Sequence, residues 1–469
     1  MYTWILDIFL GNKRKESIRR AFSFKIPPAL YSTFWVAGGV WLVLWAIPGT
    51  GGAEDVRLRL NKHVSERTRI AVPKFSNISS PEGSGGLDLE GREILMNDLI
   101  ISGLFDTIAP AGVNESGIAP SEGVDYESWT KLGAQLLILG DFEKPADEVS
   151  IKLRLFDITA KNFLLGKQYQ GEKKLYRWMI HRFADDVIGE LTGIKGSSST
   201  QIVFSSLSKG NNKEIYAVDQ DGYEPQKLTD HQSIAIAPTW SPDGANIAFT
   251  SYRYNNPNLF IMDRTGARRK MVSNDPGLND AAAWSPDGEK IAYVLSAKGN
   301  SDIYLLLKDG TKKRITTYRG IDTSPAWSPD GTRLAFTSDR NGTPQIYILD
   351  VEKGDQGPVK RISYGGGQND DPSWSPDGKS IAYTSLRGGH FEIIVEDMEN
   401  NVSLQLTTTN PGGSEHPSWS PDGRSLVFSS SKEGTAQLYV MRSDGGGLRK
   451  LTFLEGGGFE PSWSPRFYQ

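Results

Sequence analysis

The sequence predicts a two-domain protein in which a small N-terminal α/β domain precedes an all-β six-bladed β-propeller of WD40-like repeats. Three observations lead to this prediction. The phrase Trp-Ser-Pro-Asp-Gly recurs through the second half of the chain, with its tryptophans 44, 43, 47, 45 and 44 residues apart. A repeat of this length with strand-like content is typical of one propeller blade. The residues before the repeats instead alternate helical and strand-like patterns, which indicates an α/β domain.

The repeated phrase predicts a tight hairpin turn followed by a strand. Proline presets one turn torsion, glycine accepts a positive φ, and aspartate can bond to the turn backbone. A short apolar strand follows each complete copy, for example at residues 247–249 and 334–336. Four short strands per repeat make a blade, which buries its faces only against its neighbours. The complete copies begin at Trp240, Trp284, Trp327, Trp374 and Trp419, and a truncated sixth copy begins at Trp463.

The two ends of the repeat region predict how the ring closes. The first repeat starts at Gln201 without a tryptophan, so it lacks its innermost strand. The chain ends with a spare inner strand, residues 459–463. Placing that strand in the first blade gives six complete blades and leaves no open sheet edge. We therefore predict a propeller closed by the C-terminal strand.

Residues 1–53 are predicted to be a signal peptide. A basic region precedes an apolar stretch at 34–47, and small residues ending at Ala53 suit cleavage after that position. An uncleaved anchor formed by residues 29–47 remains an alternative, because about 19 apolar residues can span a bilayer. A start downstream of Met1 and export through a twin-arginine route are also left open.

The remainder divides into an N-terminal α/β domain at 54–195, a linker at 196–200 and the propeller at 201–469. Strands are expected at 69–73, 136–140 and 149–158, and helices at 93–101 and 176–191. The glycine- and serine-rich composition of residues 195–200 is typical of a linker.

Composition limits the classes of partner. The first 53 residues contain six Lys or Arg and two acidic residues, and the whole chain has a net charge of −4. The part that follows residue 53 therefore carries a net charge of −8. An acidic balance argues against binding to nucleic acid.

The sequence also predicts that the chain is not an enzyme. It contains no cysteine, which excludes thiolate metal sites and cysteine nucleophiles. No Gly-x-Ser-x-Gly elbow occurs, and the five histidines lack zinc spacing such as His-Glu-x-x-His. We expect no catalytic residue, no metal site and no cofactor. Clustered carboxylates leave Ca²⁺ in the propeller channel as an open alternative that is not predicted.

The mouth of the propeller is the predicted binding site. Residues three to five positions before each tryptophan begin the innermost strands, so they ring one end of the channel. An acidic ring would steer a basic partner and suit the capture of a protruding loop or small domain. The same residues could instead be solvated turn residues or caps of the strand ends. The candidate partner-binding residues are Asp280, Asp322, Asp370, Asp371, Glu415, His416, Phe459 and Glu460.

The whole arrangement resembles the TolB family, the periplasmic components of the Tol-Pal system of Gram-negative bacteria. The resemblance rests on the signal peptide, the α/β domain, the Trp-Ser-Pro-Asp-Gly propeller and the phrase Phe-Thr-Ser-Asp-Arg-Asn-Gly-Thr-Pro-Gln-Ile-Tyr at 336–347. It implies a non-enzymatic periplasmic protein that meets membranes only through its partners, and we expect a monomer. The implied role is in outer-membrane integrity and in constriction at cell division.

The resemblance also implies two partners. The peptidoglycan-associated lipoprotein Pal would bind at the propeller mouth, and the inner-membrane protein TolA would bind the segment after the signal peptide. The alternation of apolar and polar residues in that segment also suits a first strand of the α/β domain. The residues of this segment are Glu54, Asp55, Val56, Arg57, Leu58, Arg59 and Leu60.

A second hypothesis belongs to a different class. The chain would then be a secreted propeller that binds a small ligand or sugar in its channel, without a role in the envelope. A lectin-like site needs aromatic side chains at the mouth, and Phe459 is the one candidate that the sequence offers there.

Overall fold

The computed structural model describes residues 67–78, 86–109, 124–143, 148–208, 210, 212–409 and 411–467. The predicted signal peptide, 1–53, and the predicted TolA-binding segment, 54–60, lie outside the described residues. Within the described part, every helix is too short or too polar to cross a membrane.

The α/β domain is built on one six-stranded sheet with the order β3-β1-β4-β5-β6, to which β2 adds by pairing with β4. Strand β1 runs parallel to β3 and β4, while β4, β5 and β6 are antiparallel. In chain order the elements are β1 (Thr68–Ala71), β2 (Ser76–Asn77), α2 (Leu87–Ile101), β3 (Phe105–Ile108), α3 (Tyr126–Lys131), β4 (Leu136–Glu143), β5 (Glu148–Asp157), β6 (Asn162–Glu172), the 3-10 helix η1 (Lys173–Leu175) and α4 (Tyr176–Thr192).

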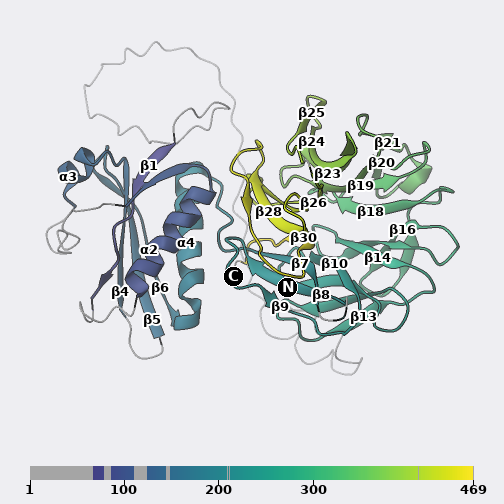
Figure 1. The fold of residues 1–469 in the computed structure, drawn as a ribbon, viewed down its shortest axis with the longest axis horizontal. Helices are drawn as coiled ribbons and strands as arrows, with labels where there is room; N and C mark the ends of the chain where they lie inside the picture. The colour runs from purple at the N-terminus through teal and green to yellow at the C-terminus, as the bar shows by residue number, and fades with distance from the viewer. Residues whose placement is uncertain are drawn as a thin grey trace, which may run out of the picture. The chain divides into compact units, whose positions relative to one another are not determined.

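Helices α2 and α4 lie side by side on one face of this sheet (Figure 1). The alternating residues Val149, Ile151 and Leu153 of β5 face them and are fully buried in the same cluster as Phe183 of α4. Helix α3 covers the opposite face, where Trp129 packs in a second cluster. The mixed α/β class expected from the sequence is confirmed.

The propeller consists, within the described residues, of six four-stranded antiparallel sheets. Its elements are β7 (Gln201–Leu207), β8 (Lys213–Asp219), β9 (Gln226–Lys227), β10 (Ala235–Trp240), β11 (Asn246–Ser251), β12 (Asn258–Asp263), β13 (Lys270–Ser273), β14 (Asn279–Trp284), β15 (Lys290–Leu295), β16 (Asp302–Leu307), β17 (Lys312–Arg314), β18 (Asp322–Trp327), β19 (Arg333–Ser338), β20 (Gln345–Asp350), the 3-10 helix η3 (Gly354–Gln356), β21 (Lys360–Arg361), β22 (Asn369–Trp374), β23 (Ser380–Arg387), β24 (His390–Asp397), β25 (Val402–Gln405), β26 (Ser414–Trp419), β27 (Ser425–Ser430), β28 (Gln437–Arg442), β29 (Arg449–Lys450) and β30 (Phe459–Trp463).

Each Trp-Ser-Pro-Asp-Gly phrase ends an innermost strand and forms the turn that follows it. In the third copy, Asp330 accepts a hydrogen bond from the Ser328 hydroxyl at 2.5 Å and another from the Thr332 amide at 3.0 Å. These bonds stabilise the carboxylate and lower the pKa of Asp330 to about 2. Gly331 has a φ of 71°, the left-handed conformation that favours glycine. The turn predicted from the repeated phrase is confirmed.

Strand β30 closes the ring by pairing with β7, which gives the first blade the order β30-β7-β8-β9. Trp463 stands opposite Ile202 in this pairing, and its indole nitrogen donates to the Thr200 hydroxyl at 2.8 Å. The indole packs among buried side chains of its own blade, including Val218, and of the neighbouring blade, including Val427. The predicted closure by the C-terminal strand is confirmed.

Replacing Trp463 by alanine is expected to lower the free energy of unfolding by about 3–5 kcal/mol, because it leaves a cavity at the closure and removes a buried hydrogen bond. Urea unfolding followed by circular dichroism measures this loss. Phe453→Ala removes an aromatic ring that is 77% exposed, so it should change the stability by about 0.5 kcal/mol or less. Equal losses of unfolding free energy in the two variants would show that Trp463 stabilises the fold no more than an exposed aromatic residue does.

Candidate partner-binding face of the propeller

The innermost strands of all six blades share a β-bulge at one position, three residues before the tryptophan. The ladder register shifts there in every blade. The residue at this position has a positive φ of 49° to 57° although it is never glycine. A bulge re-aims the side chain of its residue, and a left-handed backbone is unfavourable for other residues than glycine. We call these residues the bulge ring: Ala237, Ala281, Ser324, Asp371, His416 and Glu460.

The ionisable residues of the bulge ring all lie on one side of it, in three consecutive blades. His416 Nε2 lies 3.3 Å from the carboxylate of Asp371. Asp371 also accepts a hydrogen bond from the Ser324 hydroxyl at 3.1 Å. Glu460 accepts from the Ser205 hydroxyl at 2.8 Å and from the backbone amide of Ala237 at 3.0 Å. The ring members therefore link adjacent blades and hold the charged side chains in defined positions.

A second tier of predicted residues lies one position earlier in the strands. Asp370 accepts from the Thr337 hydroxyl at 2.7 Å, and Asp280 accepts from a backbone amide at 2.7 Å. The ammonium of Lys213 lies over the Phe459 ring, 4.4 Å from the ring centroid. Glu415 pairs with the neighbouring strand β27 through its backbone. These four residues surround the bulge ring at the start of the inner strands.

Asp322 differs from the other predicted mouth residues. It lies two positions before the bulge, its side chain is fully buried, and it forms an ion pair with Arg340 at 3.1 Å. This is the strand-end role that the sequence had left as an alternative. A buried and paired carboxylate is not available to a partner without breaking that ion pair.

Electrostatics at the mouth are dominated by carboxylates. Burial raises the pKa of Asp371 to about 6, although His416 and the Ser324 hydroxyl oppose this effect. Burial lowers the pKa of His416, but Asp371, Glu460, Glu415 and Asp370 outweigh it, so the pKa is raised overall. One imidazole thus lies among several carboxylates that compete for its proton. A basic group from a partner would relieve their repulsion.

Exposed aromatic and aliphatic side chains surround the charged mouth. They lie in the loops that join the outer strand of one blade to the inner strand of the next, so they are at the end where the inner strands begin. Tyr364 is 74% exposed and Phe453 is 77% exposed, and Tyr318 and Ile321 are also exposed. This rim was not predicted from the repeat pattern. A single aromatic residue in a glycine-rich loop, such as Tyr364 before three glycines, is the signal that points to it.

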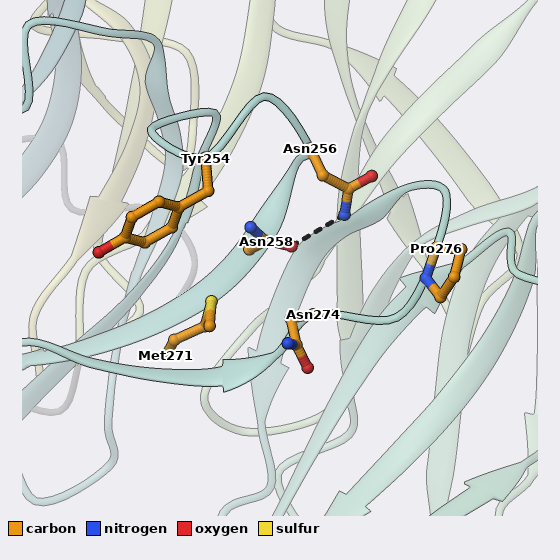
Figure 2. A pocket seen from close by; sticks show the side chains of 6 residues that line it. All are labelled: Tyr254, Asn256, Asn258, Met271, Asn274 and Pro276. Carbon is orange, nitrogen blue, oxygen red and sulfur yellow. Dashed lines mark hydrogen bonds between the residues drawn. The ribbon is translucent and has the colours of Figure 1, made fainter.

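A shallow hollow of about 260 Å³ lies between the β11–β12 hairpin and the loop after β13, lined by Tyr254, Met271, Pro276 and three asparagines (Figure 2). The Asn256 amide donates to Asn258 at 2.8 Å and to the carbonyl of Asp275 at 3.2 Å. This amide is thus engaged within the protein, which weakens the hollow as a sugar site.

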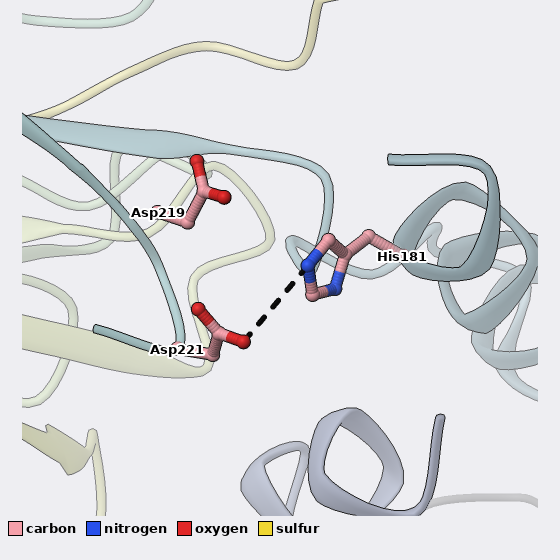
Figure 3. A group of neighbouring side chains, drawn as sticks. All are labelled: His181, Asp219 and Asp221. Atoms are coloured by element: carbon pink, nitrogen blue, oxygen red, sulfur yellow. Dashed lines mark ion pairs between the residues drawn. The ribbon is translucent and has the colours of Figure 1, made fainter. Parts of the chain in front are cut away.

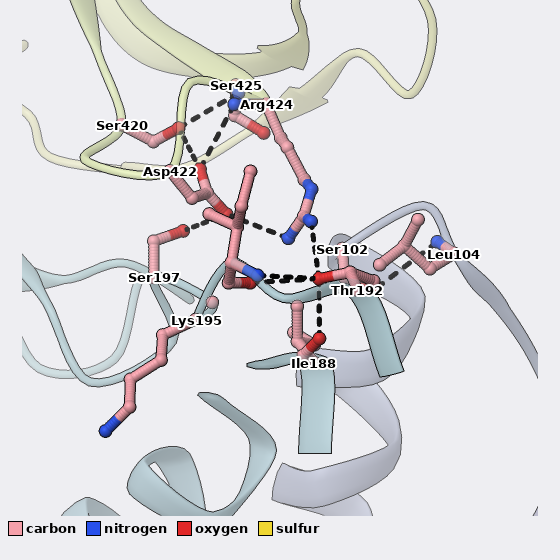
Figure 4. Close-up of polar contacts among 12 residues, drawn as sticks. Ser102, Leu104, Ile188, Thr192, Lys195, Ser197, Ser420, Asp422, Arg424 and Ser425 are labelled. Atoms are coloured by element: carbon pink, nitrogen blue, oxygen red, sulfur yellow. Dashed lines mark hydrogen bonds and ion pairs between the residues drawn. The ribbon is translucent and has the colours of Figure 1, made fainter. Parts of the chain in front are cut away.

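At the opposite ends of the inner strands, which carry the Trp-Ser-Pro-Asp-Gly turns, the fifth and the truncated sixth turn contact the end of α4 and the linker. Asp422 of the fifth turn accepts from the Ser197 hydroxyl at 3.4 Å, and Arg424 donates to the Thr192 hydroxyl at the end of α4 at 2.8 Å (Figure 4). Arg466 after the truncated turn donates to the carbonyl of Gly196 at 2.7 Å. Turn end and mouth are therefore separate surfaces of the ring.

A small α/β domain joined to a six-bladed β-propeller defines a class of two-domain propeller proteins. The chain belongs to the TolB family. The family model described as the TolB beta propeller domain matches residues 188–467, and the model described as the TolB amino-terminal domain matches residues 56–164.

Similar proteins support this assignment. Proteins named Tol-Pal system protein TolB from Desulfosudis oleivorans and Geobacter sulfurreducens are each 38% identical to this chain, over 45% and 44% of its length. In these alignments the chain spans about half the length of the relatives, 49% and 47%. The crystal structure of TolB from Acinetobacter baumannii is 28% identical, with a TM-score of 0.73, and the match covers 85% of this chain and 97% of that one.

The raised pKa of Asp371 predicts a pH dependence of stability. Because the folded pKa, about 6, exceeds the ordinary value of 3.8, the group stabilises the fold fully below pH 3.8 and loses this contribution as the pH rises through 6. Asp371→Asn is neutral throughout. Between pH 4 and pH 6, wild type should lose about 1–2 kcal/mol relative to this variant, a range reduced because the side chain is partly exposed.

Urea unfolding at several pH values, followed by tryptophan fluorescence, tests this expectation. Phe453→Ala, which removes an exposed side chain without a titratable group, should leave the pH dependence unchanged. Parallel pH profiles of wild type and Asp371→Asn would contradict the prediction.

Proposed function

We propose that this chain acts in the periplasm, within the Tol-Pal system, as a non-enzymatic binding protein. Its propeller mouth would bind a peptidoglycan-associated lipoprotein of the Pal type, and residues 54–60 would bind an inner-membrane protein of the TolA type. Such a bridge would support outer-membrane integrity and constriction at cell division. The observation that carries the proposal is the bulge ring, with Asp371, His416 and Glu460 in three consecutive blades.

Preorganisation supports binding at the mouth. The bulge fixes the direction in which each ring side chain leaves the backbone, and the bonds from Ser324 to Asp371 and from Ser205 to Glu460 hold two of the carboxylates. Binding groups that are already ordered lose little conformational entropy when a partner arrives. A ring built in this way suits a partner with a fixed protruding loop.

Charge supports a partner that presents basic groups. Asp280, Asp370, Asp371, Glu415 and Glu460 lie near one another at the mouth, with His416 among them. Desolvation of this cluster is unfavourable unless cations pair with it. Lysine or arginine side chains of a partner would supply those cations and would also increase the rate of association.

The aromatic rim supports a protein as the partner in preference to a small molecule. Exposed rings such as Tyr364 and Phe453 flank the mouth at positions that a small ligand in the channel would not cover. Aromatic side chains are enriched among the residues that contribute most to protein–protein binding. A partner that fills the mouth and extends over the rim would bury both kinds of residue.

Capture of a lipoprotein tests the proposal. The full chain, immobilised on a resin, should retain from a solubilised cell envelope a lipoprotein that carries a peptidoglycan-binding domain, identified by mass spectrometry. Combining Asp371→Asn, His416→Ala and Glu460→Gln should weaken binding of the purified lipoprotein at least tenfold, which corresponds to about 1.4 kcal/mol or more. Isothermal titration calorimetry measures the affinity.

The matched control carries Glu289→Gln and Glu399→Gln, which change the net charge by the same two units. Both side chains are exposed and lie at the turn end of the blades. The control should bind the lipoprotein like wild type. An equal loss of affinity in both variants would show that only the net charge of the protein, and not the mouth residues, determines binding. Retention of a small metabolite and of no envelope protein would favour the ligand-binding alternative instead.

Deleting residues 54–60 is expected to abolish co-purification with the TolA-type protein, while capture of the lipoprotein continues, because the two partners are assigned to different parts of the chain. Co-purification after crosslinking in intact cells measures both contacts. Circular dichroism should show an unchanged folded chain. Undiminished TolA binding would leave the segment with only the alternative role of a first strand.

A further inference from the structure

A partly buried polar cluster joins α4 to the end of β8 and the turn that follows it, away from the propeller mouth (Figure 3). Helix α4 contributes Arg177 and His181, which are one helical turn apart and therefore lie on the same side of the helix. The propeller contributes Asp219 and Asp221. Helix α2 contributes Asp98 from the other side of the imidazole. The proposed partner contacts use none of these residues.

The imidazole of His181 is oriented like that of a metal ligand. Its Nδ1 lies 2.7 Å from the carboxylate of Asp98, which favours a proton on Nδ1 and leaves the lone pair on Nε2. Metal-binding histidines commonly donate their second nitrogen to a carboxylate in this way. His181 is only 3% exposed, and its Nε2 is buried without a hydrogen-bond partner among the described residues.

Two carboxylates face this nitrogen. Nε2 lies 3.9 Å from an oxygen of Asp221, and the ligand atoms of His181, Asp219 and Asp221 all lie within 4.8 Å of one another. One oxygen of Asp219 accepts from the Gln201 amide at 3.0 Å, which leaves its other oxygen available. Ligand atoms around a tetrahedral zinc ion are about 3.3 Å apart, so only a small inward movement is needed.

We propose that His181, Asp219 and Asp221 bind a divalent first-row transition-metal ion such as Zn²⁺ between α4 and the propeller. One imidazole nitrogen and two carboxylate oxygens are ligands that such ions accept, and water would complete the coordination. Asp98 and Gln201 hold His181 and Asp219 from behind. The ion would crosslink α4 to the turn after β8.

The charges around the site are compatible with a bound cation. Asp98, Asp219 and Asp221 contribute three carboxylates. Arg177 forms an ion pair with Asp221, and Arg449 donates to the backbone carbonyl of Gln220. With a neutral imidazole, the three carboxylates outnumber the two guanidinium groups. Arg177 would stay hydrogen-bonded to a ligating carboxylate, a common arrangement around metal ligands.

A proton is the natural competitor of the metal. Burial lowers the pKa of His181, but Asp98 and Asp221 outweigh this effect and raise the pKa to about 9. A proton on Nε2 would occupy the lone pair that the metal needs, so binding must displace it. Only a direct binding measurement distinguishes a metal site from an imidazolium ion held between carboxylates.

Calorimetric titration of the metal-free full chain with Zn²⁺ at pH 7.5 tests the proposal. We expect one saturable site, together with a rise in the melting temperature as Zn²⁺ is added. His181→Gln and Asp219→Asn should each weaken Zn²⁺ binding at least tenfold. Asp219→Asn keeps the shape of the side chain, so it remains informative if His181→Gln disturbs the packing. Anomalous diffraction at the zinc edge should place the ion between α4 and the turn after β8.

His390→Gln and His416→Gln serve as matched controls, since they remove an imidazole from the β23–β24 hairpin and from the mouth. Both variants should keep the wild-type affinity for Zn²⁺. The proposal is overturned if wild type binds no Zn²⁺, or if binding survives both His181→Gln and Asp219→Asn. Loss of binding in His416→Gln alone would place the ion at the mouth and would equally overturn it. His181→Gln and Asp219→Asn should leave lipoprotein capture unchanged, so failure of the zinc site and failure of the proposed function are distinguishable.

Discussion

The pairing of β30 with β7 is the interaction on which the rest of the structure depends. It assembles one blade from two segments more than 250 residues apart in the sequence. Because each blade buries its faces against its neighbours, an unfilled first blade would expose both flanking blades. Trp463 fills that position, and its bond to Thr200 ties the last strand to the residues that follow α4. Closure therefore sets the positions of both the mouth and the turn end.

A closed ring supplies six equivalent positions at which the side chain is free to vary. The tryptophans and the Pro-Asp-Gly turns define the blades, while the bulge places one left-handed residue per blade at the mouth. A left-handed backbone costs about 1–3 kcal/mol at a residue other than glycine, and the surrounding sheet sustains it. Alanine occupies two of these positions, whereas Asp371, His416 and Glu460 occupy three in succession. The scaffold is repeated, and the chemistry of the mouth depends on where the repeats differ.

The blades, the turns and the closure could be predicted from the sequence because they depend on local patterns and on a fixed period. The bulge could not, because it interrupts the alternation of side chains that a sequence pattern assumes. Asp322 and Asp371 are both a few residues before a tryptophan, yet Asp322 is buried against Arg340 and Asp371 belongs to the bulge ring. The expectation of no metal site relied on spacing along the chain. The polar cluster at His181 escapes such a search because its residues come from two domains.

A short structural route connects the cluster at His181 with the mouth. Asp219 ends β8 opposite Gln201 of β7, and Ser205 of the same β7 donates to Glu460 in the bulge ring. Contiguity alone does not couple two sites, because coupling requires an element with two arrangements that both sites favour differently. The blades are closed and densely bonded, so they are poor candidates for that element. Helix α4 is a better one, since its contacts with the propeller are a few polar bonds, and an ion at His181 would restrict its movement.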